Sequence, residues 1–302
     1  MNISRIIDRI LGLFKWMKLF NKIFRGRGKG TYGKEIVEYL IEKYVYEYSM
    51  QKRDYDEAEK FITKIHQICI PEKVYKLKRI GRASDSGYFI PELMQFELVI
   101  AGGIGKNNDF EYYYASKGSK VVAIDPTIKR LPSEHPNITH VKKWIRGQDN
   151  ILKRDISIKY LIETNPAKRK LLKLDIEGSE YSALHGCLYE LEHFDLIVVE
   201  FHNMFKLGDE RFRKSFSEIL DTIASHFVSI CFKSNNWRNH VQFGINFVPE
   251  VFEVVFVNRG KLNFLRIGTP NDSSDMRNCL NNPNRLRIPD EPLVHGSIRD
   301  IC

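Results

Sequence analysis

Leu171-Leu-Lys-Leu-Asp-Ile-Glu-Gly-Ser-Glu180 is the stretch that decides the fold, because a short apolar run passes directly into three carboxylates around a glycine. The run Leu171–Leu174 is typical of a strand that is covered on both faces of a sheet. Gly178 permits a turn into the segment Tyr181–Leu191, which we expect to be helical. In open α/β sheets, ligands bind beyond the carboxyl ends of the strands. The pattern therefore predicts a strand, an acidic turn and a helix at a ligand-binding edge.

The acidic side chains of this turn have two interpretations. Asp175 follows the strand directly, so we expect it to line the crevice, with Glu177 and Glu180 as substrate contacts. An acid in the first turn of a helix also interacts favourably with the helix dipole. That alternative stays open, above all for Glu180.

The rest of the chain between residues 98 and 257 alternates apolar runs with amphipathic segments. The expected strands are 98–101, 120–124, 138–141, 171–174, 196–201, 227–232 and 251–257, and the expected helices are 109–116, 156–163, 181–191 and 211–225. Such alternation predicts an α/β fold with a doubly wound, mostly parallel sheet of seven strands. We expect this domain at 76–266, after a helical extension at 31–75. The Asn-, Asp- and Pro-rich tail at 267–302 is expected to be irregular.

The first 24 residues place apolar side chains at helical spacing with basic residues between them, and a Gly- and Arg-rich linker follows to residue 30. No run approaches the roughly 20 apolar residues of a membrane span, and no long uncharged core suits a signal peptide. With a formal charge of +9 for the chain, a peripheral contact of residues 1–24 with an anionic membrane surface is expected. The alternative is a helix that packs on its own domain or on a second copy.

The five cysteines are scattered and form no Cys-x-x-Cys pair. This pattern indicates neither a disulfide framework nor a zinc site, and a reducing cytoplasm is the expected compartment. Cys187 and Cys231 lie in apolar surroundings and are expected to be buried thiols.

A second motif lies at Leu98–Gly105, where an expected strand runs into Gly102, Gly103 and Gly105. Glycines at such a turn let a ligand approach the backbone. The next expected strand ends at Asp125, and an acid at that distance commonly accepts hydrogen bonds from ribose hydroxyls. These residues predict a site for a nucleoside-containing cofactor.

The cofactor is expected to be S-adenosylmethionine rather than a dinucleotide. The glycines do not form Gly-x-Gly-x-x-Gly, and Asp109 in the first helical turn would repel a pyrophosphate. S-adenosylmethionine has no phosphate, and its positive sulfonium suits an acidic pocket.

At this point the sequence resembles the FkbM family of S-adenosylmethionine-dependent methyltransferases. The resemblance runs through Arg79-Ile-Gly-Arg-Ala-Ser-Asp-Ser-Gly-Tyr88, Ala101-Gly-Gly-Ile-Gly105, Ala123-Ile-Asp-Pro-Thr127, Leu174-Asp-Ile-Glu-Gly-Ser-Glu180 and Val199-Glu-Phe-His202. It implies a class I, Rossmann-like methyltransferase fold and transfer to a hydroxyl, often on a sugar or polyketide. Ser86 departs from the pattern, since a glycine is usual there, and Ala101-Gly102 alters the usual approach to the first glycine loop.

Methyl transfer to an alcohol needs an aligned oxygen whose nucleophilicity is increased by a base or a metal. Asp175 is the predicted residue that orients or deprotonates the acceptor, and His202 is the alternative base. Asp175, Glu177 and Glu200 would be the oxygen ligands if Mg²⁺ is bound.

Four further residues are predicted to border the ligands. Asp85 and Tyr88 are placed at the cofactor, although a turn with a packed tyrosine explains them equally well. Asn235 and Asn236 are placed at the substrate, although loop asparagines often serve only to form turns.

The leading functional hypothesis is an O-methyltransferase that acts on a sugar, glycan or glycolipid precursor at the inner face of the cytoplasmic membrane. The alternative is a non-catalytic, membrane-associated module with a Rossmann-like domain. No nucleic-acid partner is expected, because the sequence shows neither a base pocket nor an RNA-binding module. The acceptor and the oligomeric state stay open.

Overall fold

The computed structural model describes residues 52–82, 86–150, 152, 154–236, 238 and 240–269. The expected basic helix at 1–24 and its linker, the helical extension up to residue 51, and Asp85 lie outside the described residues. Most of the tail, from residue 270, also lies outside them.

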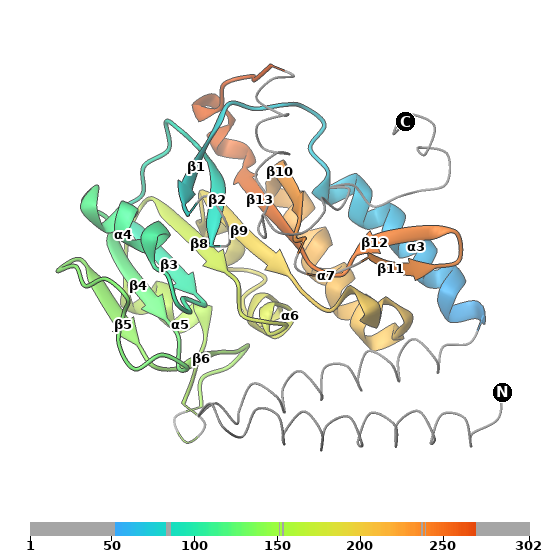
Figure 1. Cartoon of the computed structure of the whole chain (residues 1–302), viewed down its shortest axis with the longest axis horizontal. Coiled ribbons are helices and arrows are strands. Elements are labelled where there is room, and N and C mark those ends of the chain that lie inside the picture. Colours follow the sequence, from blue (N-terminus) through green and yellow to red (C-terminus); the bar gives the residue numbers. More distant parts are fainter. Residues whose placement is uncertain are drawn as a thin grey trace, which may run out of the picture.

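A seven-stranded sheet forms the centre of the molecule, in the order β10-β13-β9-β8-β3-β4-β5 (Figure 1). Its strands are β3 (Leu98–Gly102), β4 (Lys120–Ile124), β5 (Ile138–Val141), β8 (Lys170–Leu174), β9 (Leu196–Phe201), β10 (Phe227–Ser234) and β13 (Phe252–Asn258). Neighbouring strands are parallel except at β13, which is antiparallel to both β9 and β10. The predicted mostly parallel sheet of seven strands is confirmed.

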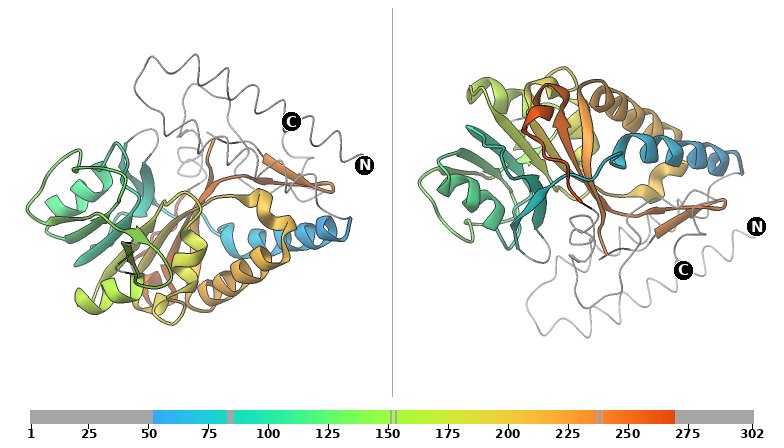
Figure 2. Two further views of the ribbon diagram at one scale, coloured as in Figure 1. Left: turned by 90° about the horizontal axis from the view of Figure 1, so that it is seen from below. Right: turned by 90° about the horizontal axis from the view of Figure 1, so that it is seen from above.

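Helices cover both faces of this sheet. They are α3 (Lys52–Cys69), α4 (Asp109–Ser116), α5 (Ile158–Thr164), α6 (Glu180–His185) and α7 (Glu210–His226), with 3-10 turns η1 (Leu191–His193), η2 (Met204–Gly208) and η3 (Arg259–Phe264). In Figure 2, α3 (blue) and α7 (gold) lie side by side, apart from α4.

Alternate residues of each strand enter different cores, which explains the continuous apolar runs. In β3, Leu98 and Ile100 pack with α3, α5, α6 and α7, whereas Val99 and Ala101 pack with α4. Each fully buried side chain of the size of Ile100 stabilises the fold by roughly 1.5–3 kcal/mol. Burial on both faces therefore holds the sheet, and with it the carboxyl ends of its strands, in a fixed place.

Three small two-stranded sheets were not predicted. They pair β1 (Leu77–Gly81) with β2 (Gly87–Pro91), β6 (Trp144–Ile145) with β7 (Asp155–Ile156), and β11 (His240–Phe243) with β12 (Asn246–Pro249). The β1–β2 hairpin matters for the site because β2 is wholly buried against the α4 face. Ser86 in its turn has φ 65°, a left-handed conformation that favours glycine. This left-handed backbone conformation explains why a glycine is usual at this position in the family that the sequence resembles.

The end of one expected helix and the start of the expected irregular tail are among the boundaries that differ from the structure. The helix expected through Leu191 ends at His185, with Gly186 as its C-cap, and Gly186 packs directly on Gly147: a Cβ on Gly186 would lie 2.2 Å from Gly147 Cα. At the other boundary, Ile267 was expected to be irregular, yet it forms an isolated bridge with Tyr75. The two ends of the described domain are thus tied together.

The buried thiols are confirmed for Cys187 and Cys231, which are 1% and 5% exposed. Across the described residues, none of the helices has the length and apolar character needed to cross a bilayer.

Candidate active site

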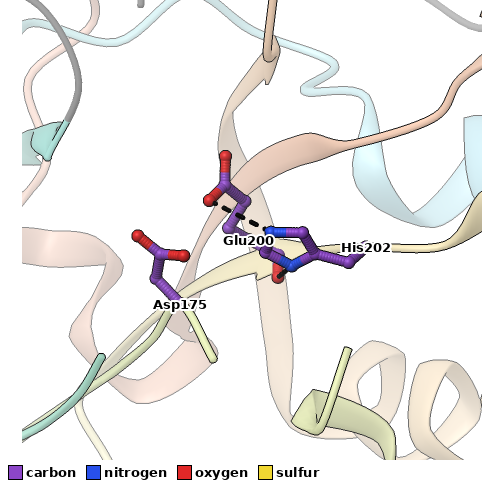
Figure 3. A group of neighbouring side chains, drawn as sticks. All are labelled: Asp175, Glu200 and His202. Atoms are coloured by element: carbon purple, nitrogen blue, oxygen red, sulfur yellow. Dashed lines mark hydrogen bonds and ion pairs between the residues drawn. The ribbon is translucent and has the colours of Figure 1, made fainter. Parts of the chain in front are cut away.

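Three chain segments meet at one edge of the sheet, where β3, β8 and β9 end. Asp175 follows β8, and its backbone N–H donates to the carbonyl oxygen of Gly102 over 3.1 Å. His202 follows β9, the neighbour of β8 on its other side. Figure 3 shows the Asp175, Glu200 and His202 side chains turned toward one another. The strand order therefore brings the glycine turn and the predicted catalytic pair together, as the sequence led us to expect.

Asp175 lies in a polar but largely enclosed environment. The Tyr88 hydroxyl donates to Asp175 Oδ2 over 2.9 Å, and Lys173 Nζ lies 4.0 Å from the same oxygen. Burial would raise the pKa of Asp175, but Lys173, a hydrogen bond with Glu200 and the charge of His202 hold it below its usual range. Asp175 is thus an ionised carboxylate at neutral pH.

Lys173 is a site residue that the sequence analysis did not single out. It lies in β8 itself, is 3% exposed, and donates to the carbonyl oxygen of Gly103. Its Nζ atom also lies 3.9 Å from Glu111 Oε1 and 5.5 Å from the centre of the Tyr88 ring. A lysine within an otherwise apolar strand was the signal that could have revealed it, because a buried charge needs partners. Lys173 links the glycine turn to Asp175.

Glu111 is the second residue that was missed. It is 1% exposed, on α4. Burial raises its pKa, and Lys173 opposes that effect. The sequence offered only an acid in a helical first turn, which is common on protein surfaces.

Glu180 is fully buried and organises the acidic turn. Its Oε1 atom accepts hydrogen bonds from the backbone N–H groups of Ile176 and Gly178, at 2.9 and 3.2 Å. The same atom lies 2.9 Å from Nδ1 of His202. These contacts show a positioning residue within the turn, and its predicted contact with substrate stays a prediction.

His202 is 6% exposed and is held from three sides. Nδ1 faces Glu180 Oε1 and lies 3.2 Å from the carbonyl oxygen of Glu200, while the Tyr181 hydroxyl donates to the His202 carbonyl oxygen over 2.5 Å. Burial alone would lower the pKa of His202, but Glu180, Glu200 and Glu177 together raise it well above its usual range. Without a further ligand, the ring is protonated at neutral pH.

Glu177 lies at the exposed mouth of the site. Its φ is 53°, and its side chain is 77% exposed, with Oε2 3.6 Å from Nε2 of His202. Gly178 next to it has φ 98°, and a Cβ there would lie 2.3 Å from Asn203 Nδ2, so only glycine fits this turn. The exposure of Glu177 is compatible with its predicted contact with an incoming substrate.

Asn235 and Asn236 follow β10 as predicted, but both are buried, at 7% and 2% exposed. The Asn235 side-chain amide donates to Glu200 Oε1 over 2.5 Å. Burial and the nearby Asp175 raise the pKa of Glu200 well above its usual range. The structure thus places Asn235 as a partner of Glu200, and the predicted substrate contacts of both asparagines stay predictions.

The glycine turn at the end of β3 combines two positions without room for a side chain and one open position. Gly103 has φ 77°, and a Cβ there would lie 1.6 Å from the Asp175 carbonyl oxygen. A Cβ on Gly102 would lie 2.5 Å from Ile145 Cδ1. Gly105 has φ 60°, and nothing lies within 4 Å of a Cβ added to it. The first two glycines are required by packing, whereas Gly105 faces open space.

Asp125 closes this turn from the side of β4. Its Oδ2 atom accepts from the backbone N–H groups of Ile104 (3.0 Å) and Gly105 (2.8 Å), and Oδ1 accepts from the N–H and hydroxyl of Thr127. Burial opposes ionisation, but these four donors hold the pKa of Asp125 below its usual range. For the predicted contact between Asp125 and the cofactor ribose, ribose hydroxyls would have to replace some of these four hydrogen bonds.

The remaining predicted cofactor residues are Tyr88 and Asp85. Tyr88 is 3% exposed and contacts Asp175 and the edge of the Phe110 ring. Tyr88 therefore lies beside the acidic turn, and its predicted contact with the cofactor stays a prediction. Asp85 lies outside the described residues.

The strand order, the antiparallel β13 and the glycine turn at the end of β3 together define a class I, Rossmann-like methyltransferase fold. Residues 103–228 match the family model described as the methyltransferase FkbM domain. The chain therefore contains a methyltransferase domain of the FkbM family.

Comparison with solved structures gives distant matches. One is precorrin-6y C5,15-methyltransferase from Geobacter metallireducens GS-15, with 8% identity, a TM-score of 0.28, and coverage of 55% of this chain and 83% of that chain. Another is 1,6-didemethyltoxoflavin-N1-methyltransferase from Burkholderia thailandensis with bound S-adenosylhomocysteine, with 12% identity, a TM-score of 0.26, and coverage of 54% and 71%. Likeness at this level carries no argument about chemistry. A search of curated proteins gives no match.

Proposed function

We propose that this protein transfers a methyl group from S-adenosylmethionine to a hydroxyl oxygen, with a sugar, glycan or glycolipid precursor as the acceptor. The observation that carries the proposal is the direct contact between the glycine turn and the acidic turn. Asp175 bonds to Gly102 through its backbone, and its carbonyl oxygen fills the space where Gly103 lacks a side chain. A cofactor on the first turn and an acceptor on the second would therefore be neighbours.

The glycine side of the site suits the proposed cofactor. Gly105 leaves open space beside the backbone, as close approach of a nucleoside requires. Asp175 and the exposed Glu177 supply negative charge near the positive sulfonium. A methyltransferase domain that uses this cofactor explains both features.

The acidic side of the site suits an acceptor hydroxyl. Methyl transfer is an in-line displacement: the acceptor oxygen forms a bond to the methyl carbon as the sulfur–carbon bond breaks, and the bonding electron pair stays on the sulfur of S-adenosylhomocysteine. The hydroxyl proton passes through the Asp175 carboxylate to solvent. The Tyr88 hydroxyl and Lys173 both lie at Asp175 Oδ2 and hold the carboxylate, which supports a role for Asp175 in accepting that hydroxyl's hydrogen bond. We therefore assign Asp175 the role of orienting the acceptor, with His202 beside it.

Incubation of the protein with methyl-labelled S-adenosylmethionine and fractionated cell-envelope material tests this function. We expect a labelled product whose methyl group survives mild base, as an ether does and a carboxyl ester does not. Asp175→Asn should lower the transfer rate at least about 100-fold, the lower range for a positioned acid–base group. Asp221→Asn, at a 64% exposed side chain on α7, is the matched control. Absence of S-adenosylmethionine binding by calorimetry, or unchanged turnover of Asp175→Asn, would refute the proposal.

A further inference from the structure

The Asp175, Glu200 and His202 side chains form a compact group of donor atoms. One carboxylate oxygen from each acid and one ring nitrogen lie within 4.8 Å of one another. Two donors on opposite sides of one ion, each at 2.0–2.3 Å, are about 4–4.6 Å apart. A small inward movement of these side chains is therefore enough to surround one cation.

The His202 ring is oriented as in a metal site. Glu180, fully buried, holds Nδ1 at 2.9 Å, which leaves Nε2 on the side of the other two ligands. A carboxylate that receives the second ring N–H is the usual outer partner of a metal-bound histidine. Within the described part of the chain Nε2 makes no hydrogen bond: it lies 3.6 Å from both Glu177 Oε2 and Glu200 Oε2. A side chain that is more than nine-tenths buried thus presents Nε2 to the group, and this nitrogen binds a cation once its proton is displaced.

Negative charge exceeds positive charge around this position. The carboxylates of Asp175, Glu177, Glu180 and Glu200 face one imidazole and the ammonium of Lys173. Burying uncompensated carboxylates is costly, and coordination of a cation is one of the few ways to offset that cost. A divalent cation would offset part of this negative charge.

We propose that Asp175, Glu200 and His202 bind a divalent cation at the acceptor side of the site. This set differs from the predicted Mg²⁺ ligands Asp175, Glu177 and Glu200, because the structure replaces exposed Glu177 with buried His202. Two oxygens and one imidazole nitrogen, without a thiolate, suit Mn²⁺ better than Mg²⁺.

The role of this cation rests on the proposed function. A cation at this point takes the acceptor oxygen as a further ligand and lowers the pKa of its hydroxyl. Glu180 is assigned as a positioning residue, because its Oε1 atom holds His202 and the backbone of the acidic turn.

Mn²⁺ binding by the full-length protein tests the site independently of methyl transfer. We expect saturable binding of one Mn²⁺ per chain by electron paramagnetic resonance and calorimetry, with weaker Mg²⁺ binding. Glu200→Gln and His202→Gln should each weaken Mn²⁺ at least about 10-fold, and Glu180→Gln about 10- to 100-fold, as for an outer-shell partner. His185→Gln, a 47% exposed histidine on α6, is the control.

Thermal unfolding keeps the test valid if a variant folds poorly. Saturating Mn²⁺ should raise the melting temperature of the wild-type protein and of His185→Gln but not of His202→Gln. No saturable binding at millimolar Mn²⁺, or equal binding by all variants, would overturn the proposal. Transfer that persists in the presence of a chelator would refute the cation's role in the reaction and leave the proposed function standing. Saturable metal binding without uptake of S-adenosylmethionine would support the metal site and refute the proposed function.

Discussion

Gly105→Ala offers the sharpest test of the cofactor site, because this glycine has a positive φ without any packing neighbour. Its φ is 60°, and no atom lies within 4 Å of an added Cβ. Gly118 shares both properties, with φ 92° and open space, but it precedes β4 and lies at the opposite edge of the sheet. The two substitutions therefore impose the same kind of backbone strain at different distances from the site.

The stability cost of either substitution is small. A left-handed conformation costs an alanine about 1–2 kcal/mol, and the loss of freedom in the unfolded chain offsets about 0.4–1 kcal/mol of that. The net loss is roughly 0–1.6 kcal/mol, or at most about 5 °C in melting temperature for a chain of this size. By contrast, Gly103→Ala must also displace the Asp175 carbonyl oxygen, so we expect a loss above about 3 kcal/mol.

The affinity for the cofactor should differ between Gly105→Ala and Gly118→Ala. A methyl group forced into the space of a bound ligand costs about 1–3 kcal/mol, which corresponds to roughly 5- to 150-fold in Kd. Calorimetry with S-adenosylhomocysteine should show this loss for Gly105→Ala and unchanged affinity for Gly118→Ala. Equal affinities for the two variants would show that the cofactor does not approach this turn.

Four further outcomes are expected. Lys173→Met should lower stability to urea by about 3 kcal/mol, and Glu111→Gln in the same chain should restore at least about 1 kcal/mol, since it removes the acid left unpaired; no recovery would refute their coupling. Asp125 has a lowered pKa, so its stabilising effect is present above its unfolded pKa near 4 and is lost as the pH falls through the folded value. Asp125→Asn should therefore be less stable than the wild type at pH 7, by a margin that shrinks below about pH 4. Burial raises the pKa of Glu250 to about 7, so its favourable contribution is lost as the pH rises from about 4.5 through 7, and Glu250→Gln should gain roughly 1–3 kcal/mol over the wild type between pH 5 and 8 in thermal melts. Deletion of residues 1–24 should reduce sedimentation with anionic vesicles, and unchanged sedimentation would count against a membrane contact.

The candidate site was predictable in part because its motifs are local. Gly102 ends β3, Gly103 follows it, and Asp175 follows β8; the apolar pattern reveals both strands, and parallel strands end at the same edge. The partners of these residues were not predictable in the same way. Asn235, after β10, reaches Glu200 in β9 across the single strand β13. The alternation of strands and helices along the sequence does not specify this strand order. The β1–β2 hairpin, which carries Tyr88 to Asp175, was also missed, since its short strands have no distinctive period.

The sequence by itself determined the seven strands, their parallel class and the glycine and acidic turns, because side-chain burial has a period that the chain displays directly. Only the tertiary structure decided which acids share a site. It placed Glu177 at the exposed mouth, Glu180 inside the turn, and His202 with Asp175 and Glu200. It also revealed Lys173 as the link between the glycine turn and Asp175. The physical reason is that the cost of a buried charge depends on neighbours distant in the chain, and the order of strands in the sheet chooses those neighbours.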